Sequence, residues 1–302
     1  MYCTGCGELR FLRPYLFVLL VAVLYVGAVL AVNGGDPLTL VVVGTRFDPG
    51  VAGGSMGYDG QFAYQMARDP LHGWQKMDNA AYRYQRLLYP LAAAALAMGQ
   101  TAWLPWTLVL ANLIALPLGT AVLESVLVQR GASRWYALVY GLNVGMLMAA
   151  RLDLHEPLAF LLFGAGALAW AREKRQWSAL WFGLAALTKE VTLVLIAGYA
   201  LAWLAQGPQW RRAAAWGALA FGPFAVWQIV LRLWLGQWGV GSGGAFATPF
   251  EVVPLRGWWK MALFDWRLFV VMSALVVPQA IGPALAALAL VGRDLIFKPA
   301  RS

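Results

Sequence analysis

The stretch PYLFVLLVAVLYVGAVLAV, Pro14 to Val32, contains no charged residue. A helix of this length is about long enough to cross the hydrocarbon core of a bilayer, and it is longer than the apolar core of a typical signal peptide, so we expect it to remain as a signal anchor. The whole chain has the same character, because 61% of its 302 residues are hydrophobic and only 12% are charged. These values lie outside the range of soluble domains and predict a membrane protein with several spans.

Further apolar runs follow along the chain. Leu87 to Met98 is one of them, but a helix of its length rises only about 18 Å, so we expect it to lie on the outer interface. Together with the first run, the others predict an all-α integral membrane protein with about eight transmembrane helices. These others are Trp103 to Val128, Trp135 to Ala150, Pro157 to Ala171, Trp177 to Leu187, Val191 to Ala205, Ala213 to Leu235 and Trp266 to Val291.

The distribution of charge orients these helices. The net charge is +9, but the bases are scattered between apolar runs and form no continuous patch, so we expect no nucleic-acid partner. Short loops such as residues 172–175 are rich in Arg and Lys, whereas most of the 14 acidic residues fall on the opposite side. By the positive-inside rule the basic side is cytoplasmic, which places both termini in the cytoplasm.

The sequence has no internal repeat, so we expect a single transmembrane domain over residues 1–302. Two substantial outer loops interrupt it, residues 33–86 and residues 236–265. Because these loops and the outer helix ends hold carboxylates and cations together, chemistry is expected on the outer face.

The first outer loop contains the sequence GYDGQFAYQMARDP, Gly57 to Pro70. Glycines on either side of Tyr58 and Asp59 allow a tight turn, and the residues after Asp59 suit a helix that ends before Pro70. Asp59 then stands at the N-cap. It is either a carboxylate that satisfies free backbone N–H groups or a catalytic group.

Two further motifs place ionisable residues at outer helix junctions. RLDLHEP, Arg151 to Pro157, packs an Arg, two carboxylates and a His into one turn, which is costly between apolar helices unless the groups are paired or used. Arg151 pairs either with Asp153 or Glu156, or with a ligand. In LTKE, ending at Glu190, Lys189 either binds phosphate or extends to the membrane interface.

Metal and thiol chemistry have weaker support in the sequence. His72 or His155, together with outer carboxylates, are the candidate ligands for a divalent metal, which is the possible cofactor, but no ligand spacing supports such a site. Cys3 and Cys6 form a CxxC with no second pair, which is more typical of reduced cytosolic thiols than of zinc.

Aromatic residues near the outer loops have two interpretations. Tyr58, Trp74, Trp258 and Trp259 either line a groove for a sugar or a lipid, or belong to the belt of Trp and Tyr at the membrane interface.

The order of these elements resembles the GT-C glycosyltransferases, a superfamily that includes protein O-mannosyltransferases and the aminoarabinose transferases of lipid A. The shared elements are a first span, a long outer loop with YDGQ, an acidic motif RLDLHEP after the third span, and an LTKE turn two spans later. The resemblance covers most of the chain as an order of elements. We expect fewer spans in this chain than in the larger members of that superfamily, and no soluble outer domain after them.

The resemblance implies roles for particular residues. The catalytic carboxylates are Asp59, the general base, with Asp153 and Glu156. Among the residues expected to bind substrate, the resemblance implies Lys189. The others are expected from their residue types and positions: Arg151, Tyr58, Gln61, Arg83, Arg86, His155 and Glu190.

The resemblance also implies a reaction and its location. A bacterial inner (plasma) membrane enzyme would move a sugar from a polyprenyl-phosphate donor to an acceptor hydroxyl on the outer face, and the acceptor would be a glycan, a lipid or a protein. A base takes the hydroxyl proton and cations stabilise the leaving phosphate. The donor's lipid tail lies among membrane lipids, so no nucleotide-binding motif is required, and the sequence contains none.

Two other functions remain open from the sequence. A transporter or lipid flippase would use the same outer charges as a vestibule, but such proteins usually carry ionisable residues near the bilayer midplane, and here only Glu124 and Arg232 lie well inside spans. A non-catalytic subunit of an envelope assembly would have much the same sequence as an active transferase.

Overall fold

A computed structural model describes residues 13–205, 207, 210–245 and 256–278 of the chain. It divides into two compact units, residues 1–246 and residues 247–302. The described residues form helices, turns and loops, and none of them lies in a β-strand. The predicted all-α class is therefore confirmed for the part of the chain that the structure describes.

Three helices of the first unit are long and apolar enough to cross a membrane: α1 (Pro14–Val32), α6 (Leu104–Gln129) and α12 (Trp210–Leu235). Their most apolar windows have mean hydropathies of 2.7, 1.8 and 1.5, which satisfies the requirement for a span. The bounds of α1 coincide with the predicted signal anchor. The described residues thus contain fewer span-length helices than the eight that we expect from the sequence.

The other predicted spans are short or broken. Trp135 to Ala150 divides into η3 (Arg134–Ala137), α7 (Leu138–Gly141) and α8 (Val144–Arg151), with a break at Asn143, whose side chain accepts the Gly145 N–H. The next helices are α9 (Glu156–Ala171), α10 (Arg175–Thr188) and α11 (Thr192–Leu204), with 16, 14 and 13 residues. Helices of these lengths rise about 20 to 24 Å, less than the ~30 Å hydrocarbon core, because polar turns end each of them early.

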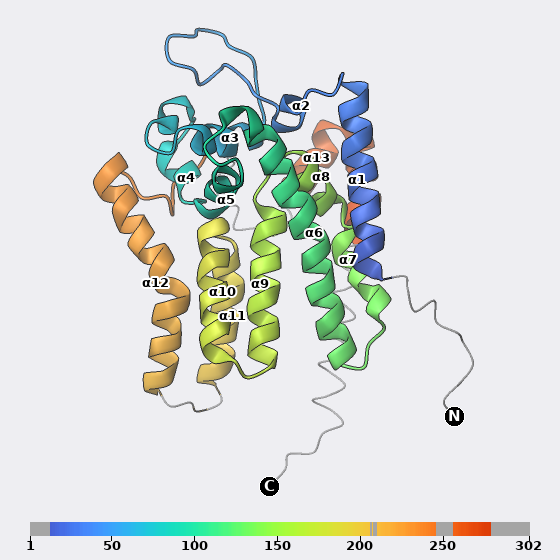
Figure 1. Cartoon of the computed structure of the whole chain (residues 1–302), viewed down its shortest axis with the longest axis vertical. Helices are drawn as coiled ribbons and strands as arrows, with labels where there is room; N and C mark the ends of the chain where they lie inside the picture. The colour runs from blue at the N-terminus through green and yellow to red at the C-terminus, as the bar shows by residue number, and fades with distance from the viewer. Residues whose placement is uncertain (1–12, 206, 208–209, 246–255, 279–302) are drawn as a thin grey trace, which may run out of the picture. The chain divides into compact units, whose positions relative to one another are not determined.

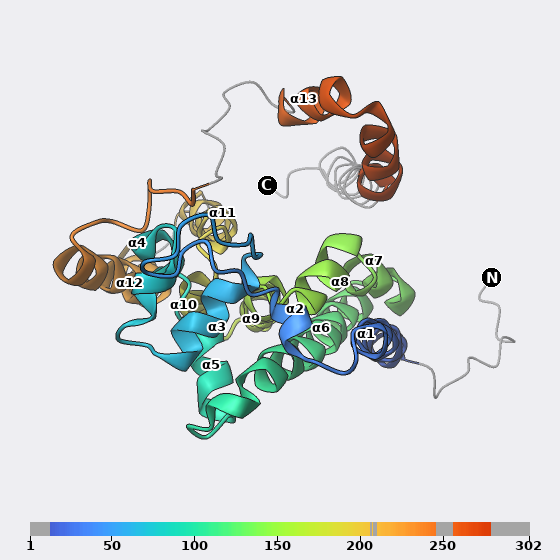
Figure 2. The ribbon, with the colours of Figure 1, turned by 90° about the horizontal axis from the view of Figure 1, so that it is seen from above.

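The first outer loop and the segment that joins it to α6 fold into short helices at one end of the bundle (Figure 1). They are α2 (Leu38–Val41), α3 (Gly60–Arg68), η1 (Gly73–Lys76), α4 (Ala80–Tyr84) and α5 (Leu88–Leu96), and η2 (Thr101–Trp103) leads into α6. Viewed from above, α4 lies next to α12, and α3 lies next to α5 (Figure 2). The nine residues of α5 rise only about 14 Å, so α5 is too short to cross, as expected from the sequence.

Apolar packing fixes the helices beneath these short elements. Phe182, Ile196 and Trp216 form the largest buried cluster, which joins α10, α11 and α12. A Cβ on Gly166 of α9 would lie 2.5 Å from the Phe182 ring, so only glycine allows α9 and α10 to approach this closely.

The second unit contains α13 (Arg256–Phe264), and a second apolar helix follows at Trp266–Pro278. The predicted span Trp266 to Val291 is therefore described only as far as Pro278. Cys3, Cys6 and the middle of the second outer loop lie outside the described residues.

Candidate functional site

The YDGQ motif forms a turn whose backbone is packed against two other segments. The Tyr58 N–H donates to the Val42 carbonyl at 2.9 Å, and the Gln61 side chain accepts the Gly44 N–H at 3.0 Å. A Cβ on Gly60 would lie 2.2 Å from the Leu152 carbonyl oxygen, so this glycine lets α3 begin directly against the RLDLHEP motif. Two motifs almost a hundred residues apart are thereby brought together.

This turn gives different surroundings to the two predicted substrate-binding residues of the motif. Tyr58 is half-exposed. Gln61 is buried, and its carboxamide oxygen holds the loop backbone at Gly44. Gln61 therefore supports the turn, whereas Tyr58 is open to a ligand.

Asp59 occupies the N-cap position of α3, but it does not cap the helix. Its backbone is helical, with φ −59° and ψ −26°, and its side chain makes no capping hydrogen bond. Instead, its Oδ2 lies 3.1 Å from Nη1 of Arg83, and half of the side chain (50%) is exposed. The interpretation of Asp59 as a helix cap is therefore wrong, and its carboxylate is accessible to solvent.

Arg83 is held between Asp59 and a buried acid, Asp78. Both Nε and Nη2 of Arg83 lie 2.8 Å from the Asp78 carboxylate oxygens, and the guanidinium carbon lies 4.0 Å from the centre of the Phe62 ring. Burial by itself raises the pKa of Asp78, but hydrogen bonds from Arg83 and from the Ala245 N–H lower this pKa below its usual value. A bidentate, stacked guanidinium has little freedom, so Arg83 fixes the direction of Asp59.

Arg86 connects the first outer loop to the LTKE motif. Its Nε and Nη2 donate to the two carboxylate oxygens of Glu190 at 2.8 and 2.6 Å, and Nη2 also reaches the Tyr82 hydroxyl at 2.8 Å. Burial raises the pKa of Glu190, but the hydrogen bonds and charge of Arg86 lower it below its ordinary value. Glu190 therefore stays ionised at neutral pH, and the tie between the two motifs is a charged pair.

Lys189 connects LTKE to RLDLHEP by an ion pair with Glu156 in the first turn of α9. Both side chains remain partly exposed, 18% for Lys189 and 25% for Glu156. Arg151, which we considered as a partner for Asp153 or Glu156, forms no ion pair with any described residue. The pairing within the motif that the sequence suggested is thus replaced by a pairing across the helix junction.

Asp153 and His155 point into the protein rather than toward solvent. Asp153 is fully buried, and neither of its carboxyl oxygens has a hydrogen-bond partner among the described residues. Burial raises its pKa well above the ordinary value, although the charge of Arg151 opposes this. Burial, and then the positive charges of Arg86, Lys189 and Arg83, lower the pKa of His155 well below its usual range. Burial therefore favours the uncharged form of both side chains.

Asn112 and Tyr89 form a hydrogen-bonded pair that contacts this buried turn. Asn112 of α6 donates to the Tyr89 hydroxyl at 2.9 Å and to the Leu154 carbonyl at 3.0 Å. The Tyr89 hydroxyl donates to the Leu108 carbonyl at 3.0 Å, and its ring packs edge-on against His155. Asn112 and Tyr89 thus hold RLDLHEP in place through groups that are themselves buried.

Sequence reasoning missed four supporting residues: Asp78, Tyr82, Tyr89 and Asn112. The sequence offered a signal for Asp78 and for Asn112, namely an acid five residues before Arg83 and a lone amide inside the apolar run of α6. It offered none for Tyr82 and Tyr89, since aromatic residues are abundant throughout this chain.

The cluster as a whole contains three cations, Arg83, Arg86 and Lys189, each paired with at least one carboxylate. Of its carboxylates, Asp59 is the most exposed. Such an arrangement is suited to accepting a proton at Asp59 while positive charge lies close by.

The possible metal site finds no support in the described residues, where no three His, Cys, Asp or Glu side chains gather in a way that could hold an ion. His72 is exposed and pairs with Asp69 at 3.2 Å. His155 is buried against Tyr89.

Comparison with known proteins does not place the chain: no known family, no curated protein and no solved structure matches it.

Proposed function

We propose that this protein is a membrane glycosyltransferase that moves a sugar from a polyprenyl-phosphate donor to an acceptor hydroxyl on the outer face of the membrane. The observation that carries this proposal is the setting of Asp59: a half-exposed carboxylate held by Arg83, which is itself locked by Asp78 and Phe62. The cluster lies at the end of the bundle where the first outer loop folds (Figure 1). It combines a fixed, accessible base with cations, as this reaction requires.

In the proposed reaction Asp59 accepts the proton of the acceptor hydroxyl. The hydroxyl oxygen forms a bond to the anomeric carbon of the sugar, and the bond from that carbon to the phosphate oxygen breaks. The polyprenyl phosphate leaves with the electron pair. Asp59 must lie within hydrogen-bond reach of the hydroxyl, and its pairing with Arg83 leaves half of the side chain open for that contact.

Lys189 is the proposed partner of the leaving phosphate. Its ammonium has three N–H donors, and Glu156 is the partner that the structure records for it. Arg86 supports it as a second cation, although Glu190 and Tyr82 already occupy its Nε and Nη2. Glu156 would exchange its bond to Lys189 for one to the substrate. Asp153 is fully buried, so in this proposal it does not contact the substrate and only positions the RLDLHEP turn.

We propose that the protein lies in the inner membrane, crosses it about eight times and has both termini in the cytoplasm. In this topology shorter and broken helices, among them α9, α10 and α11, cross the membrane in addition to the three span-length helices. Tilting or local thinning of the bilayer accommodates short helices at modest cost. Glu124 supports this orientation, because it pairs with Arg13 at 2.8 Å and with Arg134 at 3.7 Å, near the ends of α1 and α6 that the basic loops place inside.

The same contacts count against a transporter. Glu124, in the last third of α6, is paired with two bases, Arg13 and Arg134. The Arg232 guanidinium donates to the Gly236 carbonyl, just beyond the end of α12. Neither residue therefore provides the unpaired midplane charge that an ion or substrate path would use.

A transfer assay tests the proposal. Protein in liposomes is given undecaprenyl phosphate carrying labelled glucose, mannose, galactose or aminoarabinose, and bacterial membranes supply the acceptors. We expect wild type to consume one of these donors and Asp59→Asn to be slower by roughly a hundredfold or more, the usual contribution of a positioned base.

The matched control is Asp36→Asn, since Asp36 also lies in the first outer loop and accepts the Leu38 N–H, a contact that an amide oxygen preserves. This control should keep wild-type activity. Near-full activity in Asp59→Asn, or no turnover of any donor by wild type, would contradict the proposal.

A further inference from the structure

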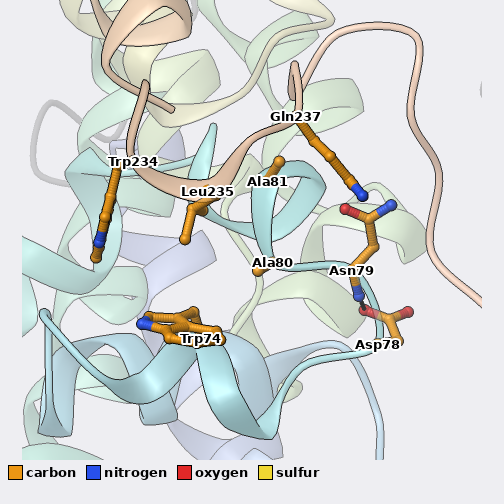
Figure 3. Close-up of a pocket in the computed structure, with 8 residues that line it drawn as sticks. All are labelled: Trp74, Asp78, Asn79, Ala80, Ala81, Trp234, Leu235 and Gln237. Carbon is orange, nitrogen blue, oxygen red and sulfur yellow. Dashed lines mark hydrogen bonds between the residues drawn. The ribbon is translucent and has the colours of Figure 1, made fainter. Parts of the chain in front are cut away.

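A pocket of about 380 Å³ lies beside the cluster, within the first unit of the chain. Trp74 of η1 and Trp234 of α12 form two of its walls (Figure 3). Its other lining residues include Leu235, Asn79, Gln237 and Asp78. Its volume falls in the range of ordinary small-molecule sites. The steps of the proposed sugar transfer do not involve this pocket.

The two indole rings of the pocket are open to a ligand. Trp74 is 36% exposed and Trp234 is 39% exposed, although both are large apolar side chains. The Trp234 ring packs edge-on against Tyr84, with the ring centres 5.3 Å apart, and so cannot turn away freely. Figure 3 shows the rings on different sides of the pocket, with the amides of Asn79 and Gln237 on a third. Rigid aromatic walls present flat apolar faces at little entropic cost.

The polar side of the pocket favours a neutral ligand. Both Asp78 oxygens are taken by Arg83, with the Ala245 N–H as a further donor. The Asn79 carboxamide accepts the Tyr82 N–H and donates to the Gly243 carbonyl. Gln237 is exposed, and the structure records no contact for its carboxamide, which therefore offers one acceptor and two donors to a ligand. None of the eight lining residues is a cation that could select a phosphate.

These features match a pyranose ring. One face of such a ring carries C–H groups that pack on an indole, and its edge carries hydroxyls that exchange hydrogen bonds with a carboxamide. We infer that this pocket binds one sugar unit of a glycan acceptor.

The position of the pocket assigns the sugar to the acceptor, and this part of the inference rests on the proposed function. Asp78 lines the pocket and binds the Nε and Nη2 edge of Arg83, while Asp59 lies at Nη1. Two consecutive contacts, from Asp78 to Arg83 and from Arg83 to Asp59, thus join the wall of the pocket to the base. A glycan held in the pocket presents a neighbouring sugar to Asp59, whereas the donor phosphate lies with Lys189.

Saturation-transfer NMR on the full-length protein in lipid nanodiscs tests the inference. The probes are methyl glycosides of glucose, mannose, galactose and N-acetylglucosamine. We expect transfer to the ring C–H protons of at least one probe. Trp74→Ala should weaken its binding about fivefold, as the loss of one aromatic contact predicts, and Trp74→Phe should restore part of it.

Two variants provide the controls. Gln237→Ala removes an exposed amide without disturbing apolar packing, and it should also weaken binding. Trp103→Ala removes an exposed Trp of η2 that lies outside the pocket, and it should leave binding unchanged. A signal that is the same in wild type and Trp74→Ala would show that Trp74 is only an interfacial anchor, which would overturn the inference.

The outcomes separate this inference from the proposed function. Asp59→Asn should bind the glycoside as wild type does while losing transfer. Failure of every glycoside to bind wild type would overturn the sugar site and leave the transfer assay on Asp59→Asn as an independent test. If Asp59→Asn binds the glycoside and also transfers sugar as fast as wild type, Asp59 is not the base, but the assignment of the pocket as a sugar site stands.

Discussion

Asp153 lies in a left-handed backbone conformation with φ +53°, fully buried, and without a hydrogen-bond partner for either carboxyl oxygen among the described residues. Left-handed backbone is unusual for a residue with a side chain, although Asp and Asn adopt it more readily than most. A buried polar group without partners lowers stability. Asp153 therefore lowers the stability of the folded protein at the RLDLHEP turn.

The buried carboxyl predicts a dependence of stability on pH. Its pKa is raised in the folded protein and is close to the ordinary value of 3.8 in the unfolded chain. The folded state therefore holds a proton that the unfolded chain releases. Its contribution is most favourable below pH 3.8 and is lost as the pH rises toward the folded pKa.

Asp153→Asn removes this proton uptake and suits the same left-handed backbone. We expect it to raise the unfolding temperature at neutral pH, because an amide has no proton to lose and no charge to bury. Thermal unfolding of detergent-solubilised protein, followed across pH, measures this. A variant that is less stable than wild type at pH 7, with the same pH slope, would contradict the prediction.

At the scale of elements, α3 and the RLDLHEP turn meet at Gly60. A Cβ there would lie 2.2 Å from the Leu152 carbonyl oxygen and 3.1 Å from that of Val41, and neither backbone can give way easily. Gly60→Ala should therefore displace α3, turn Asp59 away from Arg83 and reduce transfer by at least about tenfold, as small misplacements of reacting groups do. Stability should fall as well.

Gly198→Ala is the control for this prediction. Gly198 lies inside α11, and a Cβ there would meet nothing within 4 Å. Because Ala favours helix more than Gly does, this variant should be at least as stable as wild type. If Gly60→Ala and Gly198→Ala have the same unfolding temperature and the same transfer rate, the close approach at Gly60 affects neither stability nor the position of Asp59.

The sequence predicted the elements unevenly, for physical reasons. Long apolar runs determine α1, α6 and α12 almost to the residue, because composition alone decides a span. The break at Asn143 inside a predicted span depends on a local side-chain cap, which hydropathy does not detect. Asp59, Arg83 and Arg86 were named as candidate site residues from the sequence. Their partners were not predicted, since the Arg86–Glu190 pair, for example, spans 104 residues of sequence. Such pairs depend on tertiary packing.

At the scale of the whole molecule, the account requires that the first outer loop and the inner basic loops lie on opposite sides of the membrane. Cysteine labelling in intact cells tests this in a background with Cys3→Ser and Cys6→Ser. A membrane-impermeant maleimide should label Ser55→Cys without treatment and Ser133→Cys only after permeabilisation. Both positions are exposed in the structure, so burial alone does not explain protection. The reverse pattern would invert the topology and place the cluster in the cytoplasm.

We propose that the cluster at the end of the bundle holds a lipid-linked sugar between Asp59 and Lys189. The most direct measurement is a cryo-electron microscopy structure of Asp59→Asn in nanodiscs with the undecaprenyl-phosphate sugar that wild type consumes. The account predicts density for the phosphate within contact of Lys189, with the sugar's anomeric carbon facing residue 59. Density for the donor at another site, with Lys189 still paired to Glu156 and nothing bound at residue 59, would contradict it.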